Sequence, residues 1–371
     1  MELCIVGWYG TETIGDRAIL DGIIQIFLLN ATALHISIGS LYPFFTERTV
    51  LEDQYTTRYP NVSIDIFDVY DERMCQKVIR RSDQVLMGGG PLMDLNEMYL
   101  ILRVFEYARK KKKKTCLLGC GYGPLNQAEY IGAANHLIAC ADSVIFRDEA
   151  SQKNYQEHAA DVRSTIFLED PAIISVLKYK ETARQTAKEK IACVNFRDYP
   201  EAYFGEGSFD SQKAAKVLES LLSQTDLDIV LMPMHTFFIG GDDRRFFYDS
   251  IGDLEQERIS VISQPMSLFE TYSLIRKASL CIGMRYHSVV FQTILNSNNY
   301  VINYTNKDHG KITAFIHSIG GGDFYKDRTY HVSDEIPDPF FTFRDASFLH
   351  RWMSSDSIVK NYRKELGLRH E

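Results

Sequence analysis

The sequence lacks several features that mark specialised classes of protein. Its seven cysteines form no C-x-x-C pair, no H-x-x-x-H spacing accompanies them, and most stand in apolar runs where a free thiol behaves as a small hydrophobic group. No apolar run approaches the roughly 18–20 residues that span a bilayer. The first residues, MELCIVG, lack the basic segment of a signal peptide. We therefore expect a protein of the reducing cytoplasm that has no metal site.

An excess of positive charge is also absent. The 41 Lys and Arg residues are outnumbered by 49 Asp and Glu residues, and the net charge of −8 argues against a broad nucleic-acid-binding surface. One basic run, Lys110 to Lys114, stands apart. We interpret it as the solvated end of a helix, where cations complement the helix dipole. Contact with phosphate or with an anionic membrane is the alternative.

Short apolar segments alternate with amphipathic helical segments along nearly the whole chain, whose 371 residues are typical of two domains. Continuous apolar strands that alternate with helices indicate parallel sheets covered on both faces. The strands that we predict are 3–6, 34–38, 62–67, 84–87, 115–119, 143–147, 165–168, 191–196, 227–232, 259–262, 279–282 and 300–304, with helices such as 13–29 and 96–111 between them.

A polar stretch, residues 178–190, interrupts this alternation and is the predicted linker. We therefore predict an N-terminal domain over 1–177 and a C-terminal domain over 191–345. Each is expected to be an α/β, doubly wound, Rossmann-like domain, and the two are expected to face a cleft, as in the GT-B architecture. The last segment, 346–371, is expected to form a helix, and its packing back on the N-terminal domain is a hypothesis.

The most informative motif is Gly-Met-Arg-Tyr-His, residues 283–287, which follows a short predicted strand and opens an apolar-periodic helix. In an open α/β sheet, ligands bind beyond the carboxyl ends of the strands. A helix N-terminus there offers unpaired N–H groups and a partial positive charge. The guanidinium of Arg285 and the imidazole of His287 complete a site for a small anion, most simply phosphate or carboxylate.

Two other strand ends in the second half carry polar candidates. Arg197 follows the first predicted strand of the C-terminal domain, so it can enter the same crevice as Arg285. A surface position or an ordinary ion pair explains Arg197 equally well. His235 follows the next strand in Met-Pro-Met-His, and we consider it both as a proton donor or acceptor and as a half-buried loop histidine.

Three glycine-rich segments end strands in the first half. The first, GWYGTETIGDR, has the G-x-x-x-x-G spacing of a Walker loop but lacks its Lys and Ser/Thr, and it also fails the dinucleotide pattern G-x-G-x-x-G. Thr11, Glu12 and Asp16 remain as polar groups near the predicted cleft, although Asp16 also suits a helix start. The other two, residues 87–94 and 119–124, let the backbone approach a ligand or the other domain closely.

Two charged motifs also end strands of the first half. Arg147 and Asp148 suit an ion pair and a helix cap, so we favour a structural role for them. Asp170 precedes Pro171, and a turn explains this aspartate as well as catalysis does, because a residue before proline is held in extended geometry.

Together these motifs resemble the polysaccharide pyruvyl transferase family. The resemblance runs in order through roughly residues 3–318, and Gly283-Met-Arg-Tyr-His287 is its most specific part. The other matching segments are GWYG (7–10) with Gly15-Asp16, Gly88–Gly90 with Asp94, GYGP (121–124), Arg147-Asp148, Asp170-Pro171, Asn195–Arg197, and PMH (233–235) with Asp242-Asp243. The first loop departs from the longer Gly-Asn-x-Gly-Asp form common in the family, since Thr13-Ile14 precede Gly15-Asp16 here.

The resemblance implies a GT-B-like enzyme that transfers a pyruvyl group from phosphoenolpyruvate (PEP) to two hydroxyls of one sugar. The sugar belongs to a cell-surface polysaccharide, such as a capsule or exopolysaccharide, or to its lipid-linked precursor, and the products are a cyclic ketal and phosphate. The residues implied for PEP are Arg197, Arg285, Tyr286 and His287; the candidate acids and bases are His287, Asp16, Glu12 and His235; the candidate acceptor-binding residues are Gly10, Thr11, Gly89, Gly90 and Asp94. No cofactor is implied, because arginines can neutralise the charge on the leaving phosphate.

Two other functions stay open, because one fold hosts many chemistries. A GT-B-like glycosyltransferase with a sugar-nucleotide donor would use Arg285 on the diphosphate, and a non-catalytic glycan- or anion-binding protein would use the same site without turnover. If the acceptor is carried on a polyprenyl lipid, a cytoplasmic enzyme would work at the inner face of the membrane. Peripheral contact through Lys110–Lys114 or through the tail residues Phe348, Arg351 and Trp352 is then a further hypothesis.

Overall fold

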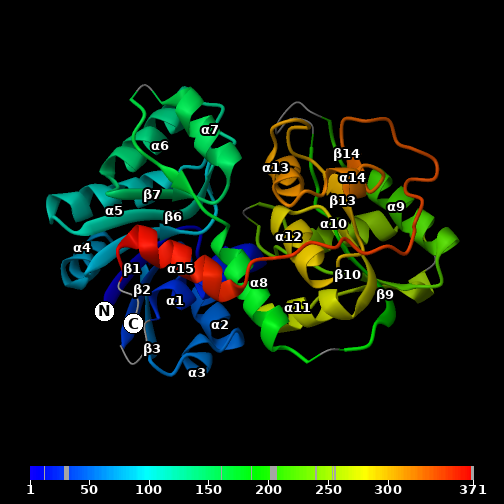
Figure 1. The fold of residues 1–371 in the computed structure, drawn as a ribbon, viewed down its shortest axis with the longest axis horizontal. Helices are drawn as coiled ribbons and strands as arrows, with labels where there is room; N and C mark the ends of the chain where they lie inside the picture. The colour runs from blue at the N-terminus through cyan, green and yellow to red at the C-terminus, as the bar shows by residue number, and fades with distance from the viewer. Residues whose placement is uncertain are drawn as a thin grey trace. The chain divides into compact units, whose positions relative to one another are not determined.

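The structure is a computed structural model that describes residues 1–11, 13–28, 33–159, 161–184, 186–200, 207–238, 240–252, 254 and 256–368. The chain divides into two compact units (Figure 1), one formed by Met1–Ser175 with Met353–Glu371 and the other by Val176–Trp352. All seven cysteines are buried free thiols. Within the described ranges, no helix has the length and apolar character that crossing a bilayer requires.

The first unit is built on a parallel sheet with the strand order β3-β2-β1-β4-β6-β7-β8, and β5 pairs with β6. Its strands are β1 (Glu2–Val6), β2 (Leu34–Ser40), β3 (Val62–Asp68), β4 (Gln84–Gly88), β5 (Pro91–Leu92), β6 (Lys114–Tyr122), β7 (Ser143–Phe146) and β8 (Ile166–Phe167). The central strands β1, β4 and β6 are almost entirely buried, as their continuous apolar sequences predict.

Helices cover this sheet. They are α1 (Ile14–Phe27), α2 (Pro43–Glu52), α3 (Tyr55–Arg58), α4 (Glu72–Arg81), α5 (Met98–Lys110), α6 (Ala128–Cys140), α7 (Glu149–His158) and α15 (Ser355–Leu366). Helices α4, α5 and α6 pack against one another and share a hydrophobic core with β1, β4 and β6. The C-terminal helix α15, red in Figure 1, packs along α1.

Helix α15 is tied to the first unit by hydrogen bonds at helix ends. Arg363 donates from Nε to the Ile26 carbonyl at 2.9 Å and from NH2 to the Leu28 carbonyl at 2.8 Å, which supplies partners for the end of α1. Lys114 Nζ donates to the Leu366 carbonyl at 3.0 Å and so caps α15. Helix α5 ends at Lys110, and Lys111 and Lys112 form the exposed turn that follows it, which fits the solvated helix end predicted for this run.

Gly22, in the middle of α1, allows this helix to approach the chain at Pro171. A Cβ at position 22 would lie 2.0 Å from the Pro171 carbonyl oxygen, so one of the two backbones would have to move. Gly22→Ala is therefore expected to lower the free energy of unfolding by about 1–3 kcal/mol, although alanine is the better helix former. Denaturant titration measures this change.

The control for this prediction is Gly132→Ala in α6, where a Cβ would meet no atom within 4 Å. That substitution is expected to raise the free energy of unfolding by up to about 1 kcal/mol. Equal effects of the two substitutions would contradict the close approach of α1 to Pro171.

The second unit repeats the architecture with a parallel sheet of order β11-β10-β9-β12-β13-β14. Its strands are β9 (Glu189–Asn195), β10 (Asp228–Leu231), β11 (Ile259–Val261), β12 (Ala278–Gly283), β13 (Asn299–Asn303) and β14 (Thr329–His331). Its helices are α9 (Ser211–Gln224), α10 (Asp243–Ile251), the short 3₁₀ helix η2 (Gln256–Arg258), α11 (Leu268–Lys277), α12 (Tyr286–Leu295), α13 (Lys311–Ser318) and α14 (Gly322–Tyr325). Helix α8 (Pro171–Thr182) contains the boundary between the units.

Both sheets are doubly wound. In each unit the chain begins in the middle of the sheet, adds two strands on one side, and then crosses to the other side. The switch in direction lies between β1 and β4 in the first unit and between β9 and β12 in the second. The predicted α/β class with two Rossmann-like sheets is confirmed, and ligands bind at such switch points in this class of fold.

Two predicted segments differ from the structure. Most of the predicted linker, 178–190, lies in regular structure, because α8 continues to Thr182 and β9 begins at Glu189. The polar residues that suggested a linker include the exposed last turn of α8 and the short irregular stretch that precedes β9. The helix predicted within 346–371 starts only at Ser355, where the Ser354 side chain accepts a hydrogen bond from Ser357 N and caps α15.

The residues before α15 are held in a non-helical conformation by aromatic packing on the second unit. Phe348 contacts the Phe324 and Tyr325 rings at 5.4 and 5.6 Å, and its backbone N–H donates to the Ser297 carbonyl. Trp352 stacks with Phe315 at 6.4 Å. These contacts explain why helical periodicity in the sequence does not produce a helix there. The edge strand β14 is a further element that the sequence pattern did not indicate.

Candidate active site

Polar side chains follow four adjacent strands of the second sheet. His235 comes after β10, Arg197 after β9, Arg285 after β12 and Tyr304 after β13, and these four strands are neighbours in the sheet. Because parallel strands end at the same edge of a sheet, these residues gather at the carboxyl edge of the second unit. We call Arg197, Arg285 and Lys311 the cation cluster, together with the Tyr304 phenol that they surround.

Asp243, the first residue of α10, organises this edge. Its buried carboxylate accepts two hydrogen bonds from Arg285 Nε, at 2.9 and 3.0 Å, and one from Arg285 NH2 at 2.6 Å. It also accepts from Asn195 Nδ2 at 3.2 Å and from the backbone N–H groups of Met234 and His235 at 3.0 and 3.2 Å. One carboxylate therefore joins the ends of β9, β10 and β12.

Arg285 is predicted from the sequence to lie in an anion site, and in the structure most of its side-chain donors already have partners. Besides its bonds to Asp243, NH2 donates to the carbonyls of Gly240 and Gly241 at 3.3 and 3.2 Å. Its backbone N–H donates to Asn195 Oδ1 at 3.2 Å, across the switch point. Among the described residues, only NH1 of this guanidinium has no hydrogen-bond partner. Arg285 is thus rigidly positioned at the N-cap of α12 and offers one amino group.

Arg197 lies beside Arg285 and is half-buried. Burial lowers the pKa of its guanidinium, and the neighbouring Arg285 lowers it further. Its Nε donates to the Asp198 carbonyl at 3.2 Å, and its Cζ lies 5.5 Å from the centre of the Tyr304 ring. Two guanidinium groups held close together repel each other, and a bound anion would relieve that repulsion.

Lys311 completes the cation cluster from the first turn of α13. Its Nζ lies 5.5 Å from the Tyr304 ring centre and 5.8 Å from that of Tyr286. Burial opposes ionisation of the Tyr304 phenol, but Lys311, Arg197 and Arg285 outweigh burial and lower its pKa to about 8. The sequence analysis identified neither Tyr304 nor Lys311. Tyr304 directly follows strand β13, so its place at a strand end could have identified it. Lys311 is the first residue of α13, and only the tertiary structure brings it to the site.

The two candidate histidines differ in position. His287 is half-buried in the first turn of α12, where its ring stacks on Phe291 at 5.8 Å and meets Tyr286 edge-on at 5.1 Å. His235 is buried, and its Nε2 lies 3.1 Å from where a Cβ of Gly240 would be. The structure thus places His287 next to Arg285 at the start of α12, and His235 beneath the loop that carries Gly240.

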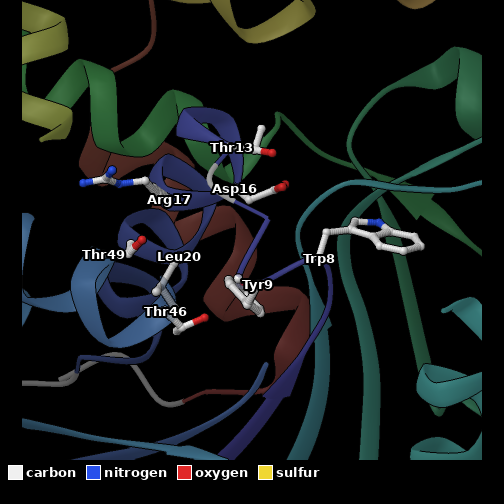
Figure 2. A pocket seen from close by; sticks show the side chains of 9 residues that line it. Trp8, Tyr9, Thr13, Asp16, Arg17, Leu20, Thr46 and Thr49 are labelled. Atoms are coloured by element: carbon white, nitrogen blue, oxygen red, sulfur yellow. The ribbon is translucent and has the colours of Figure 1, made fainter. Parts of the chain in front are cut away.

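The first unit has a pocket at the carboxyl end of β1 (Figure 2). Nine residues line it: Trp8, Tyr9, Gly10, Thr13, Asp16, Arg17, Leu20, Thr46 and Thr49. The side chains of Thr13 and Asp16 point to the same side of the loop, whereas Arg17 points away from them (Figure 2). Arg17 pairs with Asp53 through Nε at 2.8 Å and NH2 at 2.8 Å, so its charge is compensated inside the unit.

Asp16 belongs to a buried group of ionisable side chains. Arg147 NH1 lies 3.7 Å from Asp170 Oδ2, and both residues act electrostatically on Asp16. Burial raises the pKa of Asp16 to about 7; Arg147 opposes this rise and Asp170 adds to it. Thr13 hydrogen-bonds the Asp16 carboxylate. The buried Tyr9 hydroxyl also has no hydrogen-bond partner within the described residues. A carboxyl group whose pKa lies near 7 can accept or donate a proton at neutral pH.

The candidate acceptor residues lie along the same edge but serve packing as well. Gly10 and Gly89 have φ values of 91° and 104°, which favour glycine, and a Cβ on Gly89 would be 3.4 Å from Asp16 Oδ1. A Cβ on Gly90 would meet the Trp8 indole at 2.1 Å, so this glycine makes room for a side chain of the protein itself. The strand-end glycines therefore do not all face a ligand.

Thr11 and Asp94 complete the acceptor candidates. Thr11 is buried and its hydroxyl donates to the Trp8 carbonyl at 2.8 Å. Asp94 Oδ2 accepts from Asn126 N at 2.9 Å, and Oδ1 is buried with no hydrogen-bond partner among the described residues. Glu12, the remaining candidate base, lies outside the described residues. Within the described chain, no group of three or more His, Cys, Asp or Glu side chains is arranged to hold a metal ion.

With this geometry described, the chain can be assigned to a protein family. The model of the polysaccharide pyruvyl transferase family matches residues 14–306, a range that contains Asp16, Arg197 and Arg285 but neither Lys311 nor residues 8–13 of the pocket. The chain belongs to this family. The resemblance drawn from Gly283-Met-Arg-Tyr-His287 is thereby confirmed, and the protein is a transferase of the pyruvyl transferase type. No curated protein matches the sequence significantly.

Solved structures with the same fold are distant in sequence. MnaA of S. aureus in complex with UDP has a TM-score of 0.57 at 14% identity, covering 100% of this chain and 98% of that one. The UDP-GlcNAc 2-epimerase of Neisseria meningitidis bound to UDP-GlcNAc has a TM-score of 0.55 at 13% identity, covering 100% of both chains. Anabaena HepE with UDP reaches 0.53 at 11% identity over 99% and 90%. These similarities show a GT-B-like fold for this family member.

Proposed function

We propose that this family member transfers the pyruvyl group of PEP to two hydroxyls of one sugar in a cell-surface polysaccharide or its lipid-linked precursor, forming a cyclic ketal and releasing phosphate. The observation that carries the proposal is the cation cluster in the second unit. Arg197, Arg285 and Lys311 gather at the switch point beside the N-terminus of α12, and the buried Asp243 is committed to Arg285. PEP carries a phosphate and a carboxylate, which several cations suit better than one.

The expected chemistry consists of two additions at one carbon. A proton is added to the methylene carbon of PEP, and the oxygen of the first sugar hydroxyl bonds to C2 while its proton passes to a base. The C2–O bond to phosphate then breaks, phosphate leaves with the bonding electrons, and the second hydroxyl bonds to C2 and loses its proton. The cation cluster and the His287 side chain would hold the phosphate as its negative charge grows.

The first unit supplies a candidate base for the sugar hydroxyls. Asp16 has a pKa of about 7, so near neutral pH a fraction of its carboxyl groups is ionised and able to accept a proton. Gly10, Thr11, Gly89 and Asp94 lie along the same sheet edge and stay proposed contacts for the acceptor sugar, whereas Gly90 faces Trp8. A polyprenyl-linked acceptor, and with it action in the cytoplasm at the inner face of the membrane, belongs to the same proposal.

Ligand binding tests the donor. Thermal shift and calorimetry with PEP and with UDP-, GDP- and CMP-sugars are expected to show binding of PEP. Arg285→Lys keeps the positive charge beside Asp243 but loses the planar fork, and it should weaken PEP binding by about 1–3 kcal/mol. Arg245→Ala, at an exposed position in α10, is the matched control and should bind PEP as the wild type does.

The outcomes separate the functions. PEP binding that Arg285→Lys reduces supports the pyruvyl donor. Binding of a sugar nucleotide without PEP would instead favour a glycosyltransferase, and two structural neighbours contain UDP. Wild-type affinity of Arg285→Lys for PEP would remove Arg285 from the site.

A further inference from the structure

Tyr304 occupies an unusual place at the end of β13. Its ring is 7% exposed and packs edge-on against Tyr199 with the ring centres 5.0 Å apart. Arg197 Cζ and Lys311 Nζ each lie 5.5 Å from its ring centre, and side-chain hydrogen bonds link its hydroxyl with both. A buried phenol is thus held between two cations.

The charged groups around Tyr304 come from three elements. Arg197 follows β9, Arg285 caps α12, and Lys311 begins α13. All three favour the phenolate electrostatically, and the carboxylate nearest to them on α10, Asp243, is bound to Arg285. A phenolate at this position would therefore be stabilised by the positive charges of all three residues.

We propose, on the basis of the proposed function, that Tyr304 is a catalytic residue of the donor site that delivers the proton to the methylene carbon of PEP. In this step the Tyr304 O–H bond breaks and the electrons of the C2=C3 double bond form the new C3–H bond. C2 becomes electrophilic and bonds to the oxygen of the first acceptor hydroxyl, whose proton passes to a base. The C2–O bond to phosphate then breaks, and phosphate leaves with the bonding electrons. Lys311 and Arg197 compensate the phenolate, which recovers a proton from the second acceptor hydroxyl as the ketal closes.

The acidity of the group suits this role. With a pKa of about 8, Tyr304 is mostly protonated at neutral pH and yet gives up its proton far more readily than an ordinary tyrosine. It also explains why the cation cluster contains a phenol. A phenylalanine would keep the ring packing but could neither transfer a proton nor accept the hydrogen bonds of Lys311 and Arg197.

The test is proton uptake on PEP binding. Because Lys311, Arg197 and Arg285 lower the pKa of Tyr304 to about 8, part of the free protein is expected to carry the phenolate at pH 8. PEP adds negative charge beside the phenolate and should restore its proton, so wild type is expected to take up a fraction of a proton per PEP bound, measured by calorimetry in buffers of different ionisation enthalpy. Tyr304→Phe should bind PEP but lose this uptake. The near-ultraviolet absorbance of tyrosinate that appears between about pH 7 and 9 should disappear with it.

Tyr330→Phe is the matched control. Tyr330 is a buried tyrosine of the neighbouring strand β14, its hydroxyl donates to the Asp334 carbonyl at 3.0 Å, and burial raises its pKa to about 12. This variant should keep the proton uptake. With a panel of pyranoside acceptors, phosphate release from PEP should fall by about 100-fold or more in Tyr304→Phe and stay near wild type in Tyr330→Phe.

The experiment distinguishes failure of the role of Tyr304 from failure of the proposed function. If PEP binds both proteins and Tyr304→Phe still takes up the proton, the role of Tyr304 is overturned while the proposed function stands. If PEP does not bind the wild type, the proposed function is overturned and the role of Tyr304 with it.

Discussion

Asp243→Ala is expected to lower the free energy of unfolding of the second unit by about 3–5 kcal/mol, the scale for removing one partner of a buried ion pair. The carboxylate is 1% exposed. Its loss leaves the Arg285 guanidinium without a counter-charge, and Asn195, Met234 and His235 lose the acceptor of their N–H groups. Buried donors without an acceptor add their own desolvation cost.

The same substitution should also weaken PEP binding by tenfold or more. Asp243 holds Arg285 by three contacts of 3.0 Å or less, so without it the guanidinium loses its fixed direction. A site that must order its ligand-binding group on binding has lower affinity than one that is already ordered. Chemical denaturation followed by calorimetry with PEP measures both effects.

Asp242→Ala is the control at the neighbouring position. Asp242 caps α10 and pairs with Arg244 at 2.6 Å, but it is only partly buried. Loss of that cap should cost about 1 kcal/mol and leave PEP binding unchanged. If Asp243→Ala proves no less stable than Asp242→Ala, Asp243 does not organise the sheet edge as described.

Asp16→Asn is expected to make the protein more stable at high pH and less active. The pKa of Asp16 is about 7 in the folded protein against 3.8 for an exposed aspartate, so the folded state binds the proton more tightly. Ionisation of Asp16 therefore does not reduce the free energy of unfolding below about pH 4. The free energy of unfolding falls as the pH rises from there to about 7. The difference corresponds to about 4 kcal/mol above pH 7, and asparagine, which cannot ionise, should recover most of it.

Unfolding titrations of wild type and Asp16→Asn between pH 4 and 8 test the sign. The two proteins should have similar stability near pH 4 and diverge as the pH rises. Asp226→Asn is a control of opposite sign, because its hydrogen bond with Lys190 lowers the pKa of Asp226, which is exposed. A constant difference between wild type and Asp16→Asn over the pH range would contradict a buried, raised pKa.

Activity should change in the other direction. If Asp16 accepts the proton of an acceptor hydroxyl, Asp16→Asn lowers phosphate release from PEP by about 100- to 10,000-fold. Greater stability with lost turnover is the pattern of a residue kept for function at the expense of stability. Unchanged turnover would leave Asp16 as a structural residue of the pocket in Figure 2.

The strand-end argument explains why part of the site was predictable. Arg197, Arg285 and His287 stand within a few residues of a strand end, and parallel strands bring such residues to one edge. The periodic apolar segments likewise predict the doubly wound sheets, because strands buried on both faces must be apolar throughout. The glycine loops were less informative, since Gly90 makes room for Trp8 of the protein itself.

Sequence alone thus determined the fold class and the family and singled out Arg197, Arg285 and His287 as candidates, because these depend on local patterns and on their order along the chain. Only the tertiary structure decided how these residues are paired. Asp243 reaches Arg285 across 42 positions, and Lys311 meets Tyr304 although a polar loop separates them. Burial and the charges of distant residues set the proton affinities of Asp16 and Tyr304, and neither burial nor distance can be counted along a sequence.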